Sequence, residues 1–316
     1  TPEIMYLVCS GGYELILEEL LNHHEGKQPF ITGTLLHAAV QSRKKNILKL
    51  VLCDQHFGDC THHGASNNTM EANESTIDVQ TPDSWGALPI HYAASDGNVP
   101  FVKMLAQHGA NKSINAQDRH GDTPLHKAVE KVYKIFLDDI DIDRHIFRHF
   151  GAKSGSNMEV VKMLRDDYAA DVNAQDDDGN TPLLLAAKYG KWEMVKMLID
   201  KDSKYSADYN IANENGQTLI HLAAKRDEME IVQMLRDDYA VDVNAQDNNG
   251  NTPLLLAAIY GKWEMVKMLI DKNSKYSADY KITNKARQGL IHLAAEGGQI
   301  EMVQMLIDDY AADVNA

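Results

Sequence analysis

The sequence has few of the residues that cross-link chains, span membranes or bind phosphate. Only three of its 316 residues are cysteine, which excludes a disulfide framework and favours a reducing compartment such as the cytoplasm. No apolar run approaches the roughly 18 residues that a membrane-spanning helix needs. Positive charge is scarce, since 31 lysines and arginines face 46 acidic residues, a net charge of −15. This balance argues against nucleic acid and anionic membranes and favours neutral or basic partners, although a net negative charge also serves simply to keep a protein soluble.

Motifs for catalysis and cofactor binding are also missing. There is no Gly-rich phosphate loop, no nucleophile elbow and no carboxylate pair in a catalytic context, so we expect no enzymatic activity and no cofactor. One cluster has the residue types of a metal site: Cys53, His56, Cys60 and His62. Thiolates and imidazoles at short spacing can bind zinc in a tetrahedral site. The usual C-x2-C pair is absent, however, so zinc, a disulfide and loose histidines in a polar loop all remain open.

What the sequence does contain is repetition. Residues 175–245 align with residues 246–316 at an offset of 71, and only 18 of the 71 positions differ. Each block divides again, because GNTPLLLAAKYGKWEMVKML (179–198) is followed by the related GQTLIHLAAKRDEMEIVQML (216–235). Earlier versions are GTLLHAAV (33–40), GALPIHYAASDG (86–97) and GDTPLHKAV (121–129). A supersecondary unit repeated in this way indicates a solenoid.

The repeated phrase resembles the ankyrin signature T-P-L-H-x-A, which is most complete at residues 123–128. The resemblance implies an all-α ankyrin-repeat solenoid with β-hairpin fingertips, in which stacked helix pairs share one core. We expect a capping helix pair at 1–30 and ankyrin repeats over 31–316. The predicted units start near residues 31, 83, 118, 176, 213, 247 and 284. Insertions are expected near 58–80 and 131–154.

The signature residues have physical reasons to recur. Threonine caps free N–H groups at a helix start, and proline suits the first turn because no N–H is needed there. Paired alanines, such as Ala186 and Ala187, allow neighbouring helices to approach closely. Glycine in the Asp-x-x-Gly turns accepts a positive φ. In the last unit Arg287 replaces this glycine and Gly289 replaces the capping threonine, which predicts a distorted turn.

A histidine recurs at the fourth position of the phrase, in His37, His91, His126, His221 and His292. A row of histidines could indicate catalysis. In ankyrin repeats, however, this residue bonds the backbone of the neighbouring repeat. Leucine takes the same place at positions 184 and 255, which a catalytic role would not allow. We interpret the row as structural.

By resemblance, ankyrin partners contact the fingertips and the ends of the inner helices on the concave side. The predicted partner-binding residues are Trp85, Arg119, His120, Asp122, Asp177, Asp178, Lys188, Tyr189, Glu214, Lys225, Arg226, Asn248, Asn249 and Tyr260. The differences between the two copies support surface positions, because a buried core must keep its shape whereas a surface is free to change. Selection for a partner and neutral drift would both produce them.

We therefore expect a monomeric scaffold or adaptor for a protein partner. Two alternatives are a substrate-recruiting arm of a larger enzyme and a secreted bacterial effector that acts on host proteins in the host cytosol. The last copy stops at Ala316, where the other copies continue into Gln-Asp, so we expect further repeats or another domain in the full protein.

Overall fold

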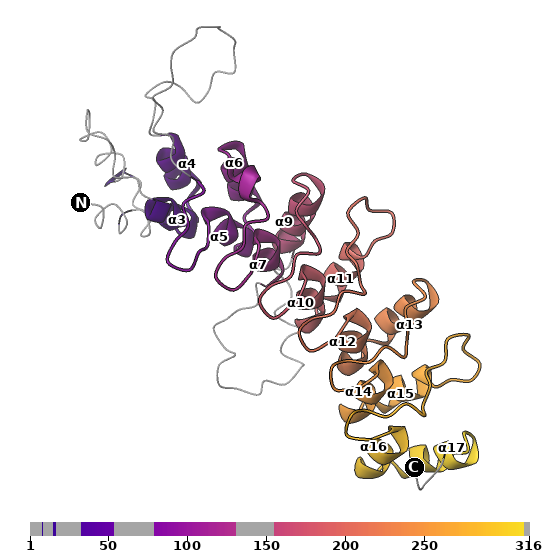
Figure 1. Cartoon of the computed structure of the whole chain (residues 1–316). Helices are drawn as coiled ribbons and strands as arrows, with labels where there is room; N and C mark the ends of the chain where they lie inside the picture. Colours follow the sequence, from indigo (N-terminus) through magenta and orange to yellow (C-terminus); the bar gives the residue numbers. More distant parts are fainter. Residues whose placement is uncertain (1–7, 9–14, 17–32, 54–78, 131–154, 313–316) are drawn as a thin grey trace. The chain divides into compact units, whose positions relative to one another are not determined.

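The computed structural model describes residues 8, 15–16, 33–53, 79–130 and 155–312 (Figure 1). The chain divides into two compact units, 1–176 and 177–316. Every regular element in these ranges is a helix, which agrees with the predicted all-α class. None is long or apolar enough to cross a membrane, since the longest, α9, has 12 residues. The capping pair at 1–30 and the insertion at 131–154 lie outside the described residues, apart from residues 8 and 15–16, as does most of the insertion at 58–80.

The described residues from 33 to 176 in unit 1 form three helix pairs and a short 3-10 helix. The elements are α3 (Gly33–Gln41), α4 (Lys45–Cys53), α5 (Pro89–Ser95), α6 (Val99–Gln107), η1 (Ala110–Ser113), α7 (Pro124–Glu130) and α9 (Gly155–Asp166). The first helices of the pairs form one layer, in which α5 packs between α3 and α7. The second helices form another layer, in which α6 contacts α4 and α9.

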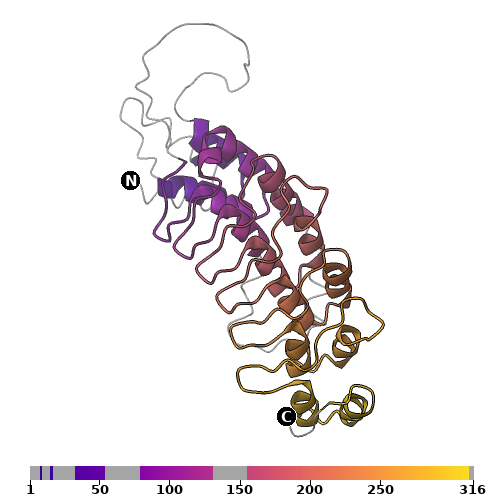
Figure 2. The same ribbon diagram turned by 45° about the vertical axis from the view of Figure 1, so that its right-hand side comes forward.

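The described part of unit 2, up to residue 312, forms four helix pairs with the same plan. They are α10 (Pro182–Lys188), α11 (Trp192–Leu198), α12 (Leu219–Arg226), α13 (Met229–Asp237), α14 (Pro253–Ile259), α15 (Trp263–Leu269), α16 (Leu290–Glu296) and α17 (Ile300–Asp308). The first helices, which we call inner helices in both units, stack in chain order, with α12 between α10 and α14. The loop before each inner helix is called a fingertip in both units. In unit 2 the fingertips before α12, α14 and α16 extend to the same side (Figure 2).

The inner helices begin as the signature predicts. Thr181 is the N-cap of α10, and its hydroxyl accepts from the backbone N–H of Leu184 at 3.3 Å. Pro182 follows in the first turn. The second copy repeats this arrangement at Thr252, whose hydroxyl accepts from Leu255 at 3.2 Å. Loss of such a cap typically costs about 1 kcal/mol.

The core lies between the helix pairs, because a single pair is too thin to enclose its own apolar side chains. In α10, Leu183 and Ala186 are fully buried, as are Leu219 and Ala223 of the neighbouring α12. Burying an aliphatic side chain contributes about 1.5–3 kcal/mol. Each unit is therefore stabilised by stacking. Trp192 and Trp263, the first residues of α11 and α15, are only partly buried.

Neighbouring fingertips are joined by single backbone hydrogen bonds. Arg119 donates to the carbonyl of Trp85 at 2.9 Å in unit 1, and Glu214 donates to the carbonyl of Asp178 at 3.0 Å in unit 2. The loops turn back on themselves like hairpins, but the described residues contain no β-strand. One bond per neighbour is too few for a ladder.

The last fingertip keeps its shape, so the predicted distortion of this turn is wrong. The N–H of Arg287 donates to the carbonyl of Asn284 at 2.8 Å, as that of Gly216 donates to Asn213 at 2.8 Å. Arg287 itself adopts φ 61°, a left-handed conformation that costs a side-chain-bearing residue about 1–2 kcal/mol. The strain is thus carried by one residue.

The structural interpretation of the histidine row is confirmed for three of its members. The ring Nε2 lies 2.8 Å from the carbonyl oxygen of Ala87 in His37, 3.0 Å from that of Ala116 in His91, and 3.0 Å from that of Ala245 in His221. The bond of His37 reaches the next repeat, and those of His91 and His221 reach the loop that leads into the next repeat. On the other side of the ring, backbone N–H groups donate to Nδ1 of His91 and His221, at 3.0 and 3.3 Å.

This geometry requires neutral imidazoles, because Nδ1 must accept a bond. Burial lowers the pKa of both His91 and His221 from 6.5. The unfolded chain therefore takes up protons near pH 6.5 that the folded chain does not. Stability is complete above this pH and falls as the pH drops below it, by at most about 1.4 kcal/mol per pH unit for each histidine. Urea titrations at pH 7.5 and 5.5 would measure the loss.

The matched control is His221→Leu, because leucine fills the equivalent positions 184 and 255. This variant loses the bond to Ala245 at every pH, but its stability should depend less on pH between 7.5 and 5.5. An unchanged pH dependence would assign the acid sensitivity to other groups.

Candidate protein-binding face

In unit 1, the structure brings together three of the predicted partner-binding residues at two adjacent fingertips. Trp85 is 61% exposed, and its ring stacks loosely on that of His120, with 6.4 Å between centroids and 21° between planes. Its N–H donates to the carboxylate of Asp83 at 2.8 Å, and its carbonyl accepts from Arg119. The backbone thus fixes a large aromatic side chain where it faces solvent, and such side chains are frequent anchors in interfaces.

Asp83 is itself held firmly. Its carboxylate also accepts from the hydroxyl of Tyr92 at 2.5 Å. Burial alone would raise the pKa of Asp83, but the hydrogen bonds from Tyr92 and from two backbone N–H groups outweigh it and hold the pKa below its ordinary value. The fingertip that carries Trp85 is therefore fixed to α5 by an ionised carboxylate.

Asp122, the residue after the turn glycine, does not lie on the exposed surface as predicted. Asp122 is 8% exposed, and its carboxylate accepts from the ammonium of Lys127 at 2.5 Å. Asn180 and Asn251 at the same position are also buried, and each accepts from an asparagine of the next fingertip, at 3.2 and 3.1 Å. This position holds neighbouring fingertips together, so Asp122 belongs to the fold rather than to a docking surface.

In unit 2, the inner helices end in a row of exposed or half-buried side chains. α10 ends at Lys188, followed by Tyr189, and α14 ends at Ile259, followed by Tyr260. Ile259 is 45% and Tyr260 48% exposed. α12 ends between them with Lys225 and Arg226. The guanidinium of Arg226 donates to the carbonyl of Lys188, and Nζ of Lys225 lies 4.7 Å from the centre of the Tyr260 ring.

The first two fingertips of unit 2 are acidic, whereas the last carries the exposed cations Lys285 and Arg287. Asp177, Asp178 and Glu214 are exposed at the first two. Asn248 and Asn249 are exposed at the third, where the side chain of Asn248 donates to the carbonyl of Glu214 at 2.6 Å. A loose ion pair of 3.9 Å between Lys188 and Asp178 links the fingertips to α10.

The differences between the two copies mostly mark surface positions, as predicted. Of the 18 differing positions, three are buried in the first copy: Ile231, Arg236 and Val241. Arg236 pairs with Asp237 at 2.7 Å and donates to the carbonyl of Met268 at 3.3 Å, which ties α13 to α15. The second copy has Ile307 here, 38% exposed, near Ile300, 80% exposed. We did not predict these apolar positions on α17. The signal in the sequence was the replacement of Arg236 by isoleucine in the second copy.

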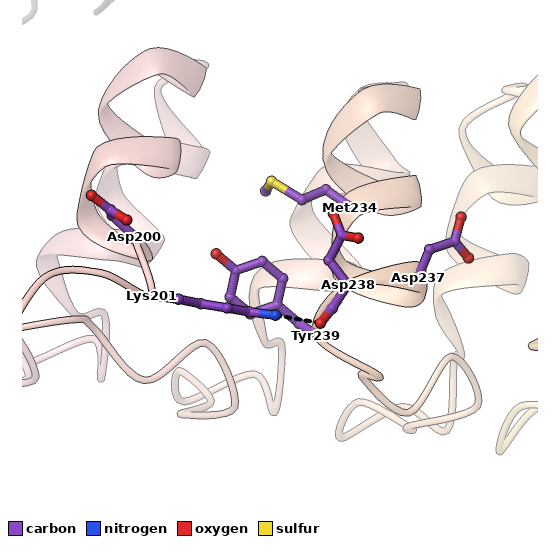
Figure 3. Close-up of a pocket in the computed structure, with 6 residues that line it drawn as sticks. All are labelled: Asp200, Lys201, Met234, Asp237, Asp238 and Tyr239. Carbon is purple, nitrogen blue, oxygen red and sulfur yellow. Dashed lines mark hydrogen bonds between the residues drawn. The ribbon is translucent and has the colours of Figure 1, made fainter.

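A shallow hollow in unit 2 lies between the ends of α11 and α13, lined by Asp200, Lys201, Met234, Asp237, Asp238 and Tyr239 (Figure 3). The ammonium of Lys201 lies 4.0 Å from the centre of the Tyr239 ring and donates to the carbonyl of Asp238. The second copy repeats this arrangement with Lys272 and Tyr310, at 4.1 Å. Because this contact recurs in the second copy and the chain's own lysine occupies the hollow, we interpret it as a joint between neighbouring repeats.

The predicted metal cluster is not tested. Cys53 ends α4, whereas His56, Cys60 and His62 lie outside the described residues. Within the described ranges, no three histidine, cysteine or acidic side chains gather in a way that could hold a metal ion.

Comparison with known proteins identifies the repeat. A family model for ankyrin repeats (three copies) matches residues 61–145, 149–247 and 239–316. A putative ankyrin repeat protein of Acanthamoeba polyphaga mimivirus is 23% identical over 216 residues, 64% of this chain and 26% of that protein. The human transient receptor potential cation channel subfamily A member 1 is 30% identical over 125 residues, 36% of this chain and 11% of the channel. An L-asparaginase of Dirofilaria immitis is 27% identical over 165 residues, 48% and 28% of the two chains.

The chain thus spans less than a third of each of these relatives. The family model, in contrast, covers well over half of the chain. Its copies extend over both compact units, and the helix pairs and fingertips described above are their structural counterpart. This protein therefore belongs to the ankyrin-repeat family, whose repeats generally serve as modules for protein–protein interaction.

Proposed function

We propose that the chain is a scaffold or adaptor that binds a protein partner through its fingertips and inner-helix ends. The observation that supports this most is the exposure of Trp85 and Tyr260 on backbone that hydrogen bonds hold in place. Side chains fixed before binding lose little conformational entropy when a partner docks. As part of the same proposal, the chain acts as a monomer in the cytoplasm, without catalysis and without nucleic acid or membrane contacts. Its acidic fingertips would contact basic groups of the partner.

The test is affinity capture with the purified chain beside a Trp85→Ala, Tyr189→Ala, Tyr260→Ala variant. Loss of an aromatic anchor typically costs about 2 kcal/mol, roughly 30-fold in affinity. We therefore expect partners captured by the wild-type chain to be lost from the variant. Quantitative mass spectrometry of both samples would show the loss.

The matched control replaces Tyr205 and Tyr276, two half-buried tyrosines in the loops after α11 and α15. A Tyr205→Ala, Tyr276→Ala variant removes aromatic side chains away from the fingertips and should keep the partners. Equal capture by the triple variant and the wild-type chain would exclude these side chains as the binding surface.

A second proposal is that the chain is the substrate-recruiting arm of a larger enzyme or of a secreted bacterial effector acting in the host cytosol. Its support is that the chain matches only parts of longer proteins, one of which is named an L-asparaginase. Under this proposal a captured partner would be chemically altered by the longer protein. A partner that binds but is never altered favours the adaptor.

A further inference from the structure

The inner-helix ends of unit 2 bring cations and apolar side chains together on a protein that is acidic overall. We call this surface the inner-end patch, formed by Lys188, Tyr189, Lys225, Arg226, Ile259 and Tyr260. Because α12 packs against both α10 and α14, the ends of the three helices are neighbours. The contacts of Arg226 with Lys188 and of Lys225 with Tyr260 connect the surface side to side.

The inner-end patch is cationic on one side and apolar on the other. Its α10–α12 side carries three cations, Lys188, Lys225 and Arg226, and its α14 side carries Ile259 and Tyr260. The adjacent α16 ends in an exposed Glu296. Acidic groups are also near the cationic side, since Asp178 lies 3.9 Å from Lys188 and Asp227 follows Arg226. Both carboxylates are exposed, and exposed pairs hold a cation only weakly.

Covering the apolar side of the patch with a partner is favourable. Ile259 and Tyr260 leave nearly half of their surfaces in water, side by side, next to the lysine that lies over the tyrosine ring. Docking of an apolar side chain here would remove this surface from water. It would also exclude water from around Lys225, which strengthens attraction to a carboxylate.

Resting on the function proposed above, we propose that the inner-end patch binds a segment of the partner in which an apolar side chain is followed or preceded by carboxylates. The apolar side chain covers Ile259 and Tyr260, and the carboxylates bind Lys225, Arg226 and Lys188. The net charge of the whole chain predicts a basic partner, whereas the local charge at this surface selects an acidic segment. The acidic fingertips remain available for basic groups elsewhere on the same partner.

The internal duplication suggests which substitutions to test. At the positions of Lys225 and Arg226, the second copy has Glu296 and Gly297, and at the position of Ile259 the first copy has Lys188. Lys225→Glu, Arg226→Gly therefore reverses the charge, and Ile259→Lys removes the apolar anchor. Each variant changes a side chain that is exposed or half-buried at a helix end, so loss of folding is not expected.

The experiment is a display library of random 12-residue peptides selected on the immobilised whole chain. We expect enrichment of peptides that combine aspartate or glutamate with an adjacent aromatic or aliphatic residue. The affinity of the best synthetic peptide, measured by fluorescence anisotropy, should fall at least 10-fold in Lys225→Glu, Arg226→Gly and at least 10-fold in Ile259→Lys. It should also weaken with added salt. Lys204→Glu, at an exposed lysine in the loop after α11, should leave the affinity unchanged.

Selection of basic or uncharged peptides, absence of any enriched peptide, or equal binding by the charge-reversed variant would each overturn the inference. The function proposed above is tested independently of this inference. If partners captured from cells depend on Trp85, Tyr189 and Tyr260 but not on Lys225 and Arg226, the scaffold remains and only the acidic segment is rejected.

Discussion

Replacing Gly216 by arginine, the residue of the second copy at this position, is expected to destabilise unit 2 by about 3 kcal/mol. Gly216 has φ 73°, which disfavours any side chain. A Cβ atom here would also lie 2.7 Å from the backbone nitrogen of Asn248 in the next fingertip. Because Asn248 is fixed by its bond to the carbonyl of Asn215, the neighbouring repeat cannot yield easily. Urea denaturation of the whole chain, followed by circular dichroism, would measure the loss.

The reverse change at the equivalent position is the matched control. Arg287 has φ 61°, but within the described residues no further fingertip follows that could collide with its side chain. Arg287→Gly should therefore stabilise the chain by up to about 1 kcal/mol, after allowance for the greater freedom of glycine in the unfolded state. If Gly216→Arg were as mild as Arg287→Gly, the stacking of fingertips would not be what selects glycine at position 216.

The second large effect is expected at Lys127 in unit 1. Its ammonium lies 2.9 Å from the carboxylate of Asp118 and 2.5 Å from that of Asp122, both of which are buried. Burial alone would lower the pKa of Lys127, but its hydrogen bonds to the two carboxylates raise the pKa above its ordinary value. Lys127→Leu leaves two carboxylates side by side without their cation, which should cost about 3 kcal/mol at pH 7.

Unit 2 shows how this loss can be repaired. Leu256 occupies the position of Lys127, Asn251 that of Asp122, and Asp247 that of Asp118. Asp247 is buried without a lysine, and its carboxylate accepts from the backbone N–H groups of Asn249 and Asn251, both at 2.8 Å. In place of the lysine, the side-chain amides of Gln217 and Asn251 donate to the same carboxylate at 3.3 and 3.4 Å. The Lys127→Leu, Asp122→Asn variant should therefore recover most of the stability. Thermal and urea unfolding of both variants would decide, and a double variant as unstable as the single one would contradict the explanation.

Some features of the fold follow from nearby residues in the sequence, and others do not. The caps at Thr181 and Thr252, the positive φ of Gly216 and the backbone bonds of His37, His91 and His221 follow from residues a few positions apart or from a repeated position. The burial of Asp122 does not, because this position packs where neighbouring fingertips meet, as the bonds of Asn180 and Asn251 to the next fingertip show. Three other residues of the predicted surface, Trp85, Arg119 and His120, are exposed as expected.

By itself, the sequence determines the repeated unit, since each short phrase encodes a cap, a helix, a turn and an apolar stripe that no single unit can bury. The tertiary structure alone decides which side chains of that unit stay in water. The reason is stacking: the same turn position is a glycine packed against the next fingertip where one follows, and a strained arginine at the last fingertip described. The juxtaposition of Lys188, Arg226 and Tyr260, some 35 residues apart along the chain, likewise exists only because three helices end side by side.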